Sequence, residues 1–263
     1  MRNTFFPGTM TIRVPELLSR LVTAESLKRN FLKKDGRGNE NEFFNKMLPG
    51  MLAYREYKKG YLRDYLDKTI KSSIATGMQD KILDFLAESF DYKYFDKSEY
   101  ECNSTVNLRF DVENERLYAD LFVRLDNIGI KRSAYLRNLM QEYFSLAEYQ
   151  KERICFKNEY DILLDALNDE IIVQITMNKK SCNAYPLSLE YSVKSEHWYF
   201  LYFEEGDYGI LHSIPLYKID NILLLYCTAS VPDDRYSEQI YSIIETEEFD
   251  SKESFELGGI KNA

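Results

Sequence analysis

The sequence predicts an α+β protein, in which a helical N-terminal region precedes a small β-barrel and a short C-terminal extension. Two observations carry this prediction. Apolar residues at helical spacing dominate the first part of the chain, and in two places a short segment of alternating polar and apolar residues, typical of a strand, precedes them. From residue 170 the period changes to two, in five short runs separated by turn residues, which is typical of a small barrel. We therefore place the domains at 1–155, 156–227 and 228–263.

The first strand-helix-helix unit starts at residue 9. Polar and apolar residues alternate over 9–14, which indicates a strand with one buried face. Pro15 ends the strand and suits the first turn of a helix. Apolar residues at helical spacing then run over 16–34, until the glycine loop at 35–38 stops them. A second helix is predicted over about 41–48.

The same plan recurs near residue 105. The alternating segment 105–110 aligns with 9–14, and a helix is predicted over 113–127, ended by Gly129. Ser133 is a good N-cap for the helix that follows. We interpret the two segments as diverged copies of one unit.

The remaining segments complete the prediction. Residues 49–88, rich in Lys and Tyr, have the periodicity of one or two helices, and 91–101 is typical of a connector. The five strands are expected at 170–177, 184–191, 198–204, 210–215 and 222–227. One more helix is expected over 235–244, followed by an acidic and mobile end.

The charge is distributed unevenly along the chain. The formal net charge is -9, which by itself argues against a polyanionic partner. Residues 1–75, however, contain fifteen Lys or Arg and eight Asp or Glu, a net charge of +7, so the remainder carries -16. The tail from Thr228 onward has nine acidic and three basic residues. Contact with a nucleic acid is therefore expected in the N-terminal part.

The residue types also limit the chemistry. There is no apolar run typical of a signal peptide or a membrane span, so we expect a cytoplasmic protein. The four cysteines (Cys102, Cys155, Cys182 and Cys227) are far apart, which indicates reduced, mostly buried thiols and no zinc site or disulfide framework.

Catalytic signals are sparse. The chain has two histidines and no phosphate-binding glycine loop, nucleophile elbow or metalloprotease helix. A catalytic pair of buried acids among the 43 carboxylates remains an alternative. We expect no enzyme, no cofactor and no metal.

The segment 129–137 resembles the loop and second-helix start of ribbon-helix-helix proteins, and 41–48 is a looser match to the same place. The resemblance implies that the two strands pair into an antiparallel ribbon of the kind that enters a DNA major groove. Its outward residues would be Thr9, Thr11, Arg13, Thr105, Asn107 and Arg109, whose side chains suit base edges or phosphates. Lys131 and Arg132 would lie at a helix N-terminus, which favours anions. The alternative is an assembly ribbon with a merely solvated face.

The segments 186–189, 198–200 and 214–219 resemble, in order and spacing, the pattern of WYL domains. These are similar to Sm-like, SH3-type barrels and act in ligand sensing or nucleic-acid binding. Here Phe200 replaces the usual leucine, and Lys218 stands where the family usually has arginine. Lysine offers a point charge and no bidentate fork, which leaves bidentate phosphate recognition open.

Alternation along the predicted 198–204 strand separates its side chains. Trp198 is expected in the core, whereas Tyr199 is expected on the opposite face, where it would border a groove and stack on a base. His212 and Lys218 are candidate anion contacts, with ordinary surface residues as the alternative reading.

A ribbon-helix-helix-like region joined to a WYL domain resembles the WYL accessory proteins of type VI-D CRISPR systems. The resemblance implies a non-catalytic protein, a homodimer, that binds RNA, single-stranded by preference, and raises the activity of an RNA-targeting effector nuclease. Two alternatives remain: a DNA-binding transcriptional regulator with a ligand-sensing WYL domain, and a scaffold for protein assembly.

Overall fold

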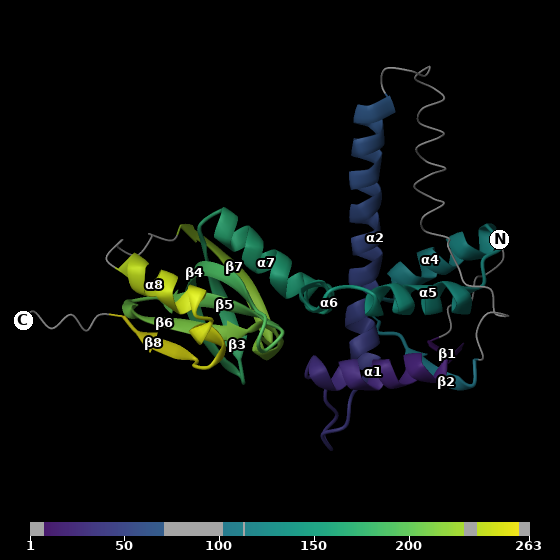
Figure 1. Cartoon of the computed structure of the whole chain (residues 1–263), viewed down its shortest axis with the longest axis horizontal. Helices are drawn as coiled ribbons and strands as arrows, with labels where there is room; N and C mark the ends of the chain where they lie inside the picture. The colour runs from purple at the N-terminus through teal and green to yellow at the C-terminus, as the bar shows by residue number, and fades with distance from the viewer. Residues whose placement is uncertain (1–7, 71–101, 113, 229–235, 258–263) are drawn as a thin grey trace, which may run out of the picture. The chain divides into compact units, whose positions relative to one another are not determined.

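The computed structural model describes residues 8–70, 102–112, 114–228 and 236–257 (Figure 1). Contacts divide the chain into two compact units, Met1–Leu146 and Ala147–Ala263. This division falls before the boundary placed at residue 155, because the helix over 148–155 packs on the sheet of the second unit.

The N-terminal unit contains a strand followed by two helices, twice over. The described elements are β1 (Thr9–Val14), α1 (Glu16–Lys28), α2 (Glu40–Ile70), β2 (Ser104–Arg109), α4 (Glu115–Asn127) and α5 (Arg132–Phe144). The strands pair antiparallel, so residues 90 to 100 positions apart in the sequence lie side by side. The connector predicted at 91–101 and part of the helical segment before it lie outside the described residues.

Helix α2 is longer than the predicted 41–48 segment, because it continues through Pro49 to Ile70. A proline inside a helix removes one backbone hydrogen bond. The side chains of Met47, Leu48 and Met51 are buried around it, and their burial offsets that loss.

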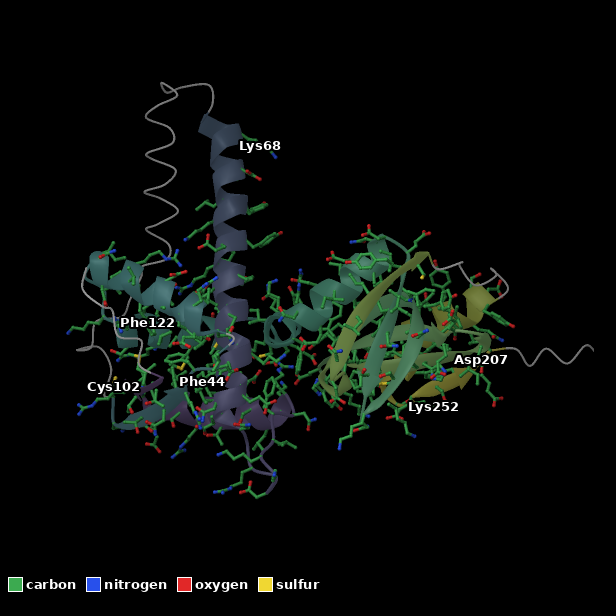
Figure 2. The ribbon with its side chains drawn as sticks, turned by 180° about the vertical axis from the view of Figure 1, so that it is seen from behind. Phe44, Lys68, Cys102, Phe122, Asp207 and Lys252 are labelled. Carbon is green, nitrogen blue, oxygen red and sulfur yellow. The ribbon has the colours of Figure 1, made fainter. Side chains whose placement is uncertain are left out.

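The core of this unit lies between the inner face of the two strands and the helices. Ile12, Val106 and Leu108 are buried on that face, as their alternation predicted. Phe44 of α2 and Phe122 of α4 are buried in the same unit (Figure 2).

An ion-pair network joins α2 to α5. Glu142 accepts hydrogen bonds from Arg55 Nε at 2.7 Å and Lys58 Nζ at 2.9 Å. Burial, the largest single influence, favours the protonated acid, but the charges and hydrogen bonds of Arg55 and Lys58 together outweigh it and hold the pKa of Glu142 below its usual range. The network fixes the middle of α2 against α5.

The second unit is a sheet covered by helices. Its elements are α6 (Glu148–Cys155), α7 (Lys157–Asn168), β3 (Ile171–Met177), β4 (Lys180–Ser192), β5 (His197–Glu204), β6 (Asp207–Pro215), η2 (Leu216–Lys218), β7 (Asn221–Thr228), α8 (Ser237–Glu245), η4 (Glu248–Asp250) and β8 (Ser254–Glu256). The strand order is β7-β3-β4-β5-β6-β8, and all neighbours are antiparallel. The five predicted strands are present as β3 to β7.

The expected five-stranded barrel is corrected in two respects. A sixth strand, β8, joins the sheet beside β6, and in the described residues the edge strands β7 and β8 do not pair with each other, so the sheet is open. The additional strand comes from the C-terminal segment that we expected to be mobile.

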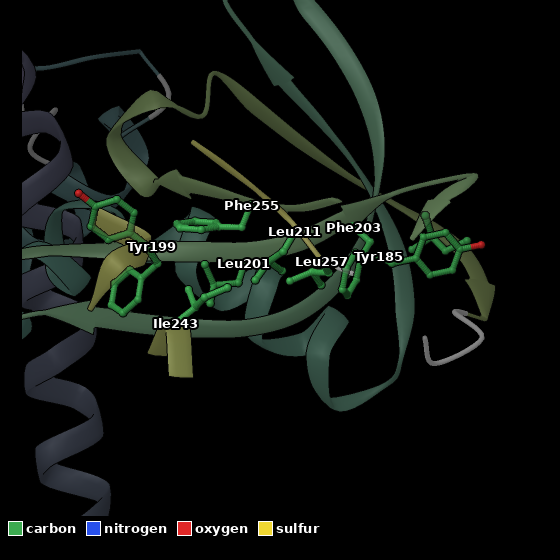
Figure 3. Close-up of a cluster of buried hydrophobic side chains, with 10 residues drawn as sticks. Tyr185, Tyr199, Leu201, Phe203, Leu211, Ile243, Phe255 and Leu257 are labelled. Carbon is green, nitrogen blue, oxygen red and sulfur yellow. The ribbon is translucent and has the colours of Figure 1, made fainter. Parts of the chain in front are cut away.

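That segment packs into the core because its acidic residues are interrupted by large apolar ones. Phe249, Phe255 and Leu257 are buried with Leu201 and Phe203 in one cluster (Figure 3). The prediction of a mobile end is therefore wrong for residues 246–257, whereas 258–263 lie outside the described residues.

Candidate nucleic-acid interface

Strands β1 and β2 form a two-stranded ribbon with one polar face. Thr9 lies opposite Arg109, Thr11 opposite Asn107, and Arg13 opposite Thr105. These six side chains, which we call the ribbon face, are all exposed, while the intervening side chains on the other face are covered. The structure therefore brings together all the outward residues that the sequence placed on this ribbon.

Two asparagines of α2 hold the end of β2. Asn41 Oδ1 accepts a hydrogen bond from the backbone N–H of Arg109 at 3.2 Å, and Asn45 Nδ2 donates to the carbonyl of Arg109 at 2.8 Å. Asn45 Oδ1 also accepts from the N–H of Asp111 at 3.1 Å. The backbone at Arg109 is thus fixed on both sides while its guanidinium points to solvent.

The side chains of the ribbon face form a hydrogen-bonding centre between two cations. Thr11 Oγ1 donates to Asn107 Oδ1 at 2.7 Å, which leaves the amide N–H groups of Asn107 available to another acceptor. Arg13 and Arg109 lie four strand residues apart along the ribbon, about 13 Å at 3.3 Å per residue. Within the described ranges neither guanidinium has an ion-pair partner. This arrangement suits phosphates at the ends and base or sugar groups between them.

Lys131 and Arg132 differ in availability. Helix α5 begins at Arg132, with Lys131 and not Ser133 as its N-cap. Arg132 donates from Nε and Nη2 to the two carboxylate oxygens of Asp126, which lowers the pKa of Asp126, and its guanidinium lies over the Phe122 ring. Lys131 is exposed. Arg132 is therefore engaged within the fold, and Lys131 is the member of the pair that faces solvent.

The prediction for Tyr199 is wrong. Only 6% of Tyr199 is exposed, and its ring lies beside Leu201 in the buried cluster, 5.3 Å from the ring of Phe249 (Figure 3). Burial also raises the pKa of its hydroxyl. The ring is not available to stack on a base.

Trp198 is half-buried and not fully in the core as expected. Its Nε1 donates to the carbonyl of Tyr149 at 2.9 Å, and its ring packs on Tyr160. Both faces of β5 are covered, one by α6 and α7 and the other by the C-terminal segment. Alternation therefore does not separate an inner from an outer face on this strand.

His212 and Lys218 both stand beside carboxylates. The His212 ring stacks on Tyr202, and its Nε2 is 4.0 Å from Glu204 Oε1. Lys218 Nζ donates to Glu253 Oε1 at 2.8 Å, and this hydrogen bond raises the pKa of Lys218 and lowers that of Glu253. A phosphate would have to compete with these acids.

The charges of the two units differ in sign. Residues 1–146 contain 24 Lys or Arg and 21 Asp or Glu, a net charge of +3, whereas 147–263 contain 10 and 22, a net charge of -12. Phosphate contacts depend on Lys and Arg and are opposed by surrounding carboxylates. The charge distribution therefore favours the ribbon face over the sheet of the second unit as a place for a phosphate to bind.

One buried acid was not anticipated. Glu152 of α6 is fully buried and accepts hydrogen bonds from His197 Nδ1 at 2.9 Å and from the backbone N–H of Trp198 at 2.7 Å. It fastens α6 to β5. No pattern in the sequence distinguishes Glu152 from the other charged residues of this short helix, among which Lys151 is also buried.

Two absences hold among the described residues. Within them no group of three or more His, Cys, Asp or Glu side chains is arranged to hold a metal ion. None of their helices, including the long but polar α2, is apolar enough over 18 residues to cross a membrane.

No protein-family model matches the chain, and no curated protein matches its sequence. Solved structures do match its fold. A protein described as "Crystal structure of a CRISPR Cas-related protein" aligns with a TM-score of 0.61 over 93% of this chain and 72% of its own, at 10% identity. "Proteasome accessory factor B/C (PafBC) of Arthrobacter aurescens" aligns over 50% of this chain and 24% of its own, at 10% identity and a TM-score of 0.26. The first likeness shows a shared fold, and the second is too low to show one.

Proposed function

We propose that the chain is a non-catalytic, RNA-binding accessory protein that raises the activity of an RNA-targeting type VI-D CRISPR effector nuclease. The observation that carries the proposal is the ribbon face, where Arg13 and Arg109 flank an exposed threonine–asparagine centre. The shared fold with a CRISPR Cas-related protein and the resemblance of the motifs to WYL accessory proteins support the CRISPR assignment.

In this proposal the two guanidinium groups bind phosphates, and Asn107 with the neighbouring threonines binds sugar or base groups. Each phosphate neutralised by a cation releases counterions, so affinity falls with salt in proportion to the number of contacts. Lys131 adds a further exposed cation in the same unit.

The test is fluorescence anisotropy with labelled single-stranded RNA, single-stranded DNA and duplex DNA across a salt series. We expect the tightest binding to single-stranded RNA. The Arg13→Ala/Arg109→Ala variant should bind more weakly, and its slope of log affinity against log salt should be shallower by about 1.4, at about 0.7 per phosphate contact of a single strand.

The matched control is His212→Ala/Lys218→Ala, which changes two candidate residues of the acidic second unit. Its affinity should stay within about twofold of the wild type. The opposite pattern, with the second-unit variant weakened and the ribbon variant unaffected, would move the site away from the ribbon.

Effector modulation is tested separately, by the rate of target-RNA cleavage by a type VI-D effector with and without the chain. The wild type should raise the rate, and the ribbon variant should raise it less. An unchanged cleavage rate despite RNA binding would reject the accessory role.

A DNA-binding regulator is the second candidate, because an antiparallel ribbon with Thr and Asn side chains also fits base edges in a DNA major groove. Sequence-selective binding to duplex DNA that exceeds binding to RNA would favour it. If the chain binds no nucleic acid at any salt concentration, the scaffold alternative remains.

A further inference from the structure

The C-terminal half of α2 carries a row of exposed tyrosines that the ribbon face does not include. Tyr57, Tyr61 and Tyr65 are 73%, 68% and 58% exposed, and they follow one another at four-residue intervals. In Figure 1 this half of α2 continues beyond α4 and α5. We call these three residues the tyrosine row.

Helix geometry places the tyrosine row on one side of α2. Each step of four residues advances about 6 Å along the axis and 40° around it, so the three rings span about 80° of the circumference. This 6 Å spacing is close to twice the 3.4 Å between stacked nucleotides of one strand. The backbone positions that carry neighbouring rings are therefore about as far apart as two bases that enclose a third.

Lysines accompany the tyrosine row. Lys58 precedes Tyr61 by three residues and is half-exposed, but its ammonium is bonded to Glu142 at 2.9 Å. Lys68 follows Tyr65 by three residues, is exposed and projects from the last turn of α2 (Figure 2). The acid Glu56 lies on the opposite side of α2, where it forms an ion pair with Lys59. Asp64 is exposed at one edge of the row.

Exposed aromatic rings beside lysines match the chemistry of single-stranded nucleic acid, in which bases stack on the rings and phosphates contact the cations. A duplex hides its base faces and offers the rings nothing to stack on. A protein partner would use the same rings as apolar surface, and Lys68 would then serve no specific purpose.

We propose that the tyrosine row is a stacking site for single-stranded RNA, in which bases stack on Tyr57, Tyr61 and Tyr65 while Lys68 contacts the backbone. The inference rests on the proposed RNA-binding function and adds a second contact to the ribbon face. It gives the chain a physical means to prefer single strands over duplexes.

The experiment measures anisotropy of a fluorescein-labelled 12-nucleotide oligouridine with the full chain and with variants at position 61. Tyr61→Ala and Tyr61→Leu should each weaken binding at least about fivefold, because both lose the ring, whereas Tyr61→Phe should stay within about twofold. The salt slope should remain that of the wild type, since no phosphate contact is lost. Affinity for a 12-base-pair RNA duplex should not change.

Tyr241→Ala is the matched control, because Tyr241 is also an exposed helical tyrosine, 67% exposed, on α8 of the acidic unit. It should bind the oligouridine as the wild type does. Thermal melts verify that each variant stays folded, and Tyr57→Ala and Tyr65→Ala repeat the measurement at the flanking rings.

The possible negative results distinguish failure of the tyrosine row from failure of the proposed function. Wild-type affinity in Tyr61→Ala, with the ribbon variant weakened, would overturn the tyrosine row and leave the proposed function standing; such a row would suit a protein partner instead. Full affinity in Tyr61→Leu would overturn stacking. A wild type that binds no RNA would overturn both proposals.

Discussion

The buried carboxylate of Glu152 provides a quantitative test of how the second unit is held together. In Glu152→Ala, the backbone N–H of Trp198 loses its acceptor and Nδ1 of His197 loses its hydrogen-bond partner. Each buried polar group left unsatisfied costs about 1–3 kcal/mol. We therefore expect the unit to lose about 3 kcal/mol or more of unfolding free energy.

Glu152→Gln should cost much less, about 1 kcal/mol. Its carbonyl oxygen can accept the Trp198 N–H, and its amide can donate to His197 Nδ1 in the tautomer that carries the proton on Nε2. Comparing the loss of unfolding free energy in the alanine variant with that in the glutamine variant therefore separates the contribution of the hydrogen bonds from that of packing.

Urea denaturation followed by tryptophan fluorescence is a suitable assay. Trp198 is the sole tryptophan of the chain, so the signal reports on the second unit alone. With a slope of about 1–3 kcal/mol/M, the alanine variant should lower the midpoint by about 1 M or more. An alanine variant within about 0.5 kcal/mol of the wild type, or a glutamine variant as unstable as the alanine one, would refute this reasoning.

The remaining predictions concern the N-terminal unit and the sheet core. The lowered pKa of Glu142 means that its ion pairs stabilise the fold above its usual pKa of 4.5 and are lost as pH falls through the lowered value. Glu142→Gln should thus cost about 2 kcal/mol at pH 7 in thermal or urea denaturation and flatten the acid limb of the stability profile; an unchanged acid limb would contradict this. Asn45→Ala should speed amide hydrogen exchange at Asp111 about fivefold or more, corresponding to about 1 kcal/mol, and unchanged protection there would argue against the bond. Phe203 is fully buried, so Phe203→Ala should lower the unfolding free energy by about 3–5 kcal/mol, followed by Trp198 fluorescence. A loss below about 1 kcal/mol would show that Phe203 is not part of the core.

The N-terminal ribbon was predictable because its two strands are covered on one side only. Alternation then assigns each residue to a face, and the outward set from Thr9 to Arg13 and from Thr105 to Arg109 emerged as predicted. The repeated strand-helix-helix plan indicated which strands belong together.

The second unit was less predictable for the same physical reason. Strand β5 is buried on both sides, so alternation does not tell Tyr199 from its neighbours. The layer that covers Tyr199 comes from Phe249 and Phe255, isolated apolar residues in an acidic tail where β8 is only three residues long. Such a short strand has no period to detect.

If the ribbon face binds a nucleic acid, as proposed, its construction from one chain has a consequence for the sequence of that target. When two copies of a chain build a ribbon, two-fold symmetry forces the same residue onto both strands, and the preferred target is then a palindrome. Here both strands belong to one chain, and their central positions have diverged to Thr11 on one strand and Asn107 on the other. The two halves of the ribbon are free to read different groups, so a directional, non-repeating strand is an acceptable target.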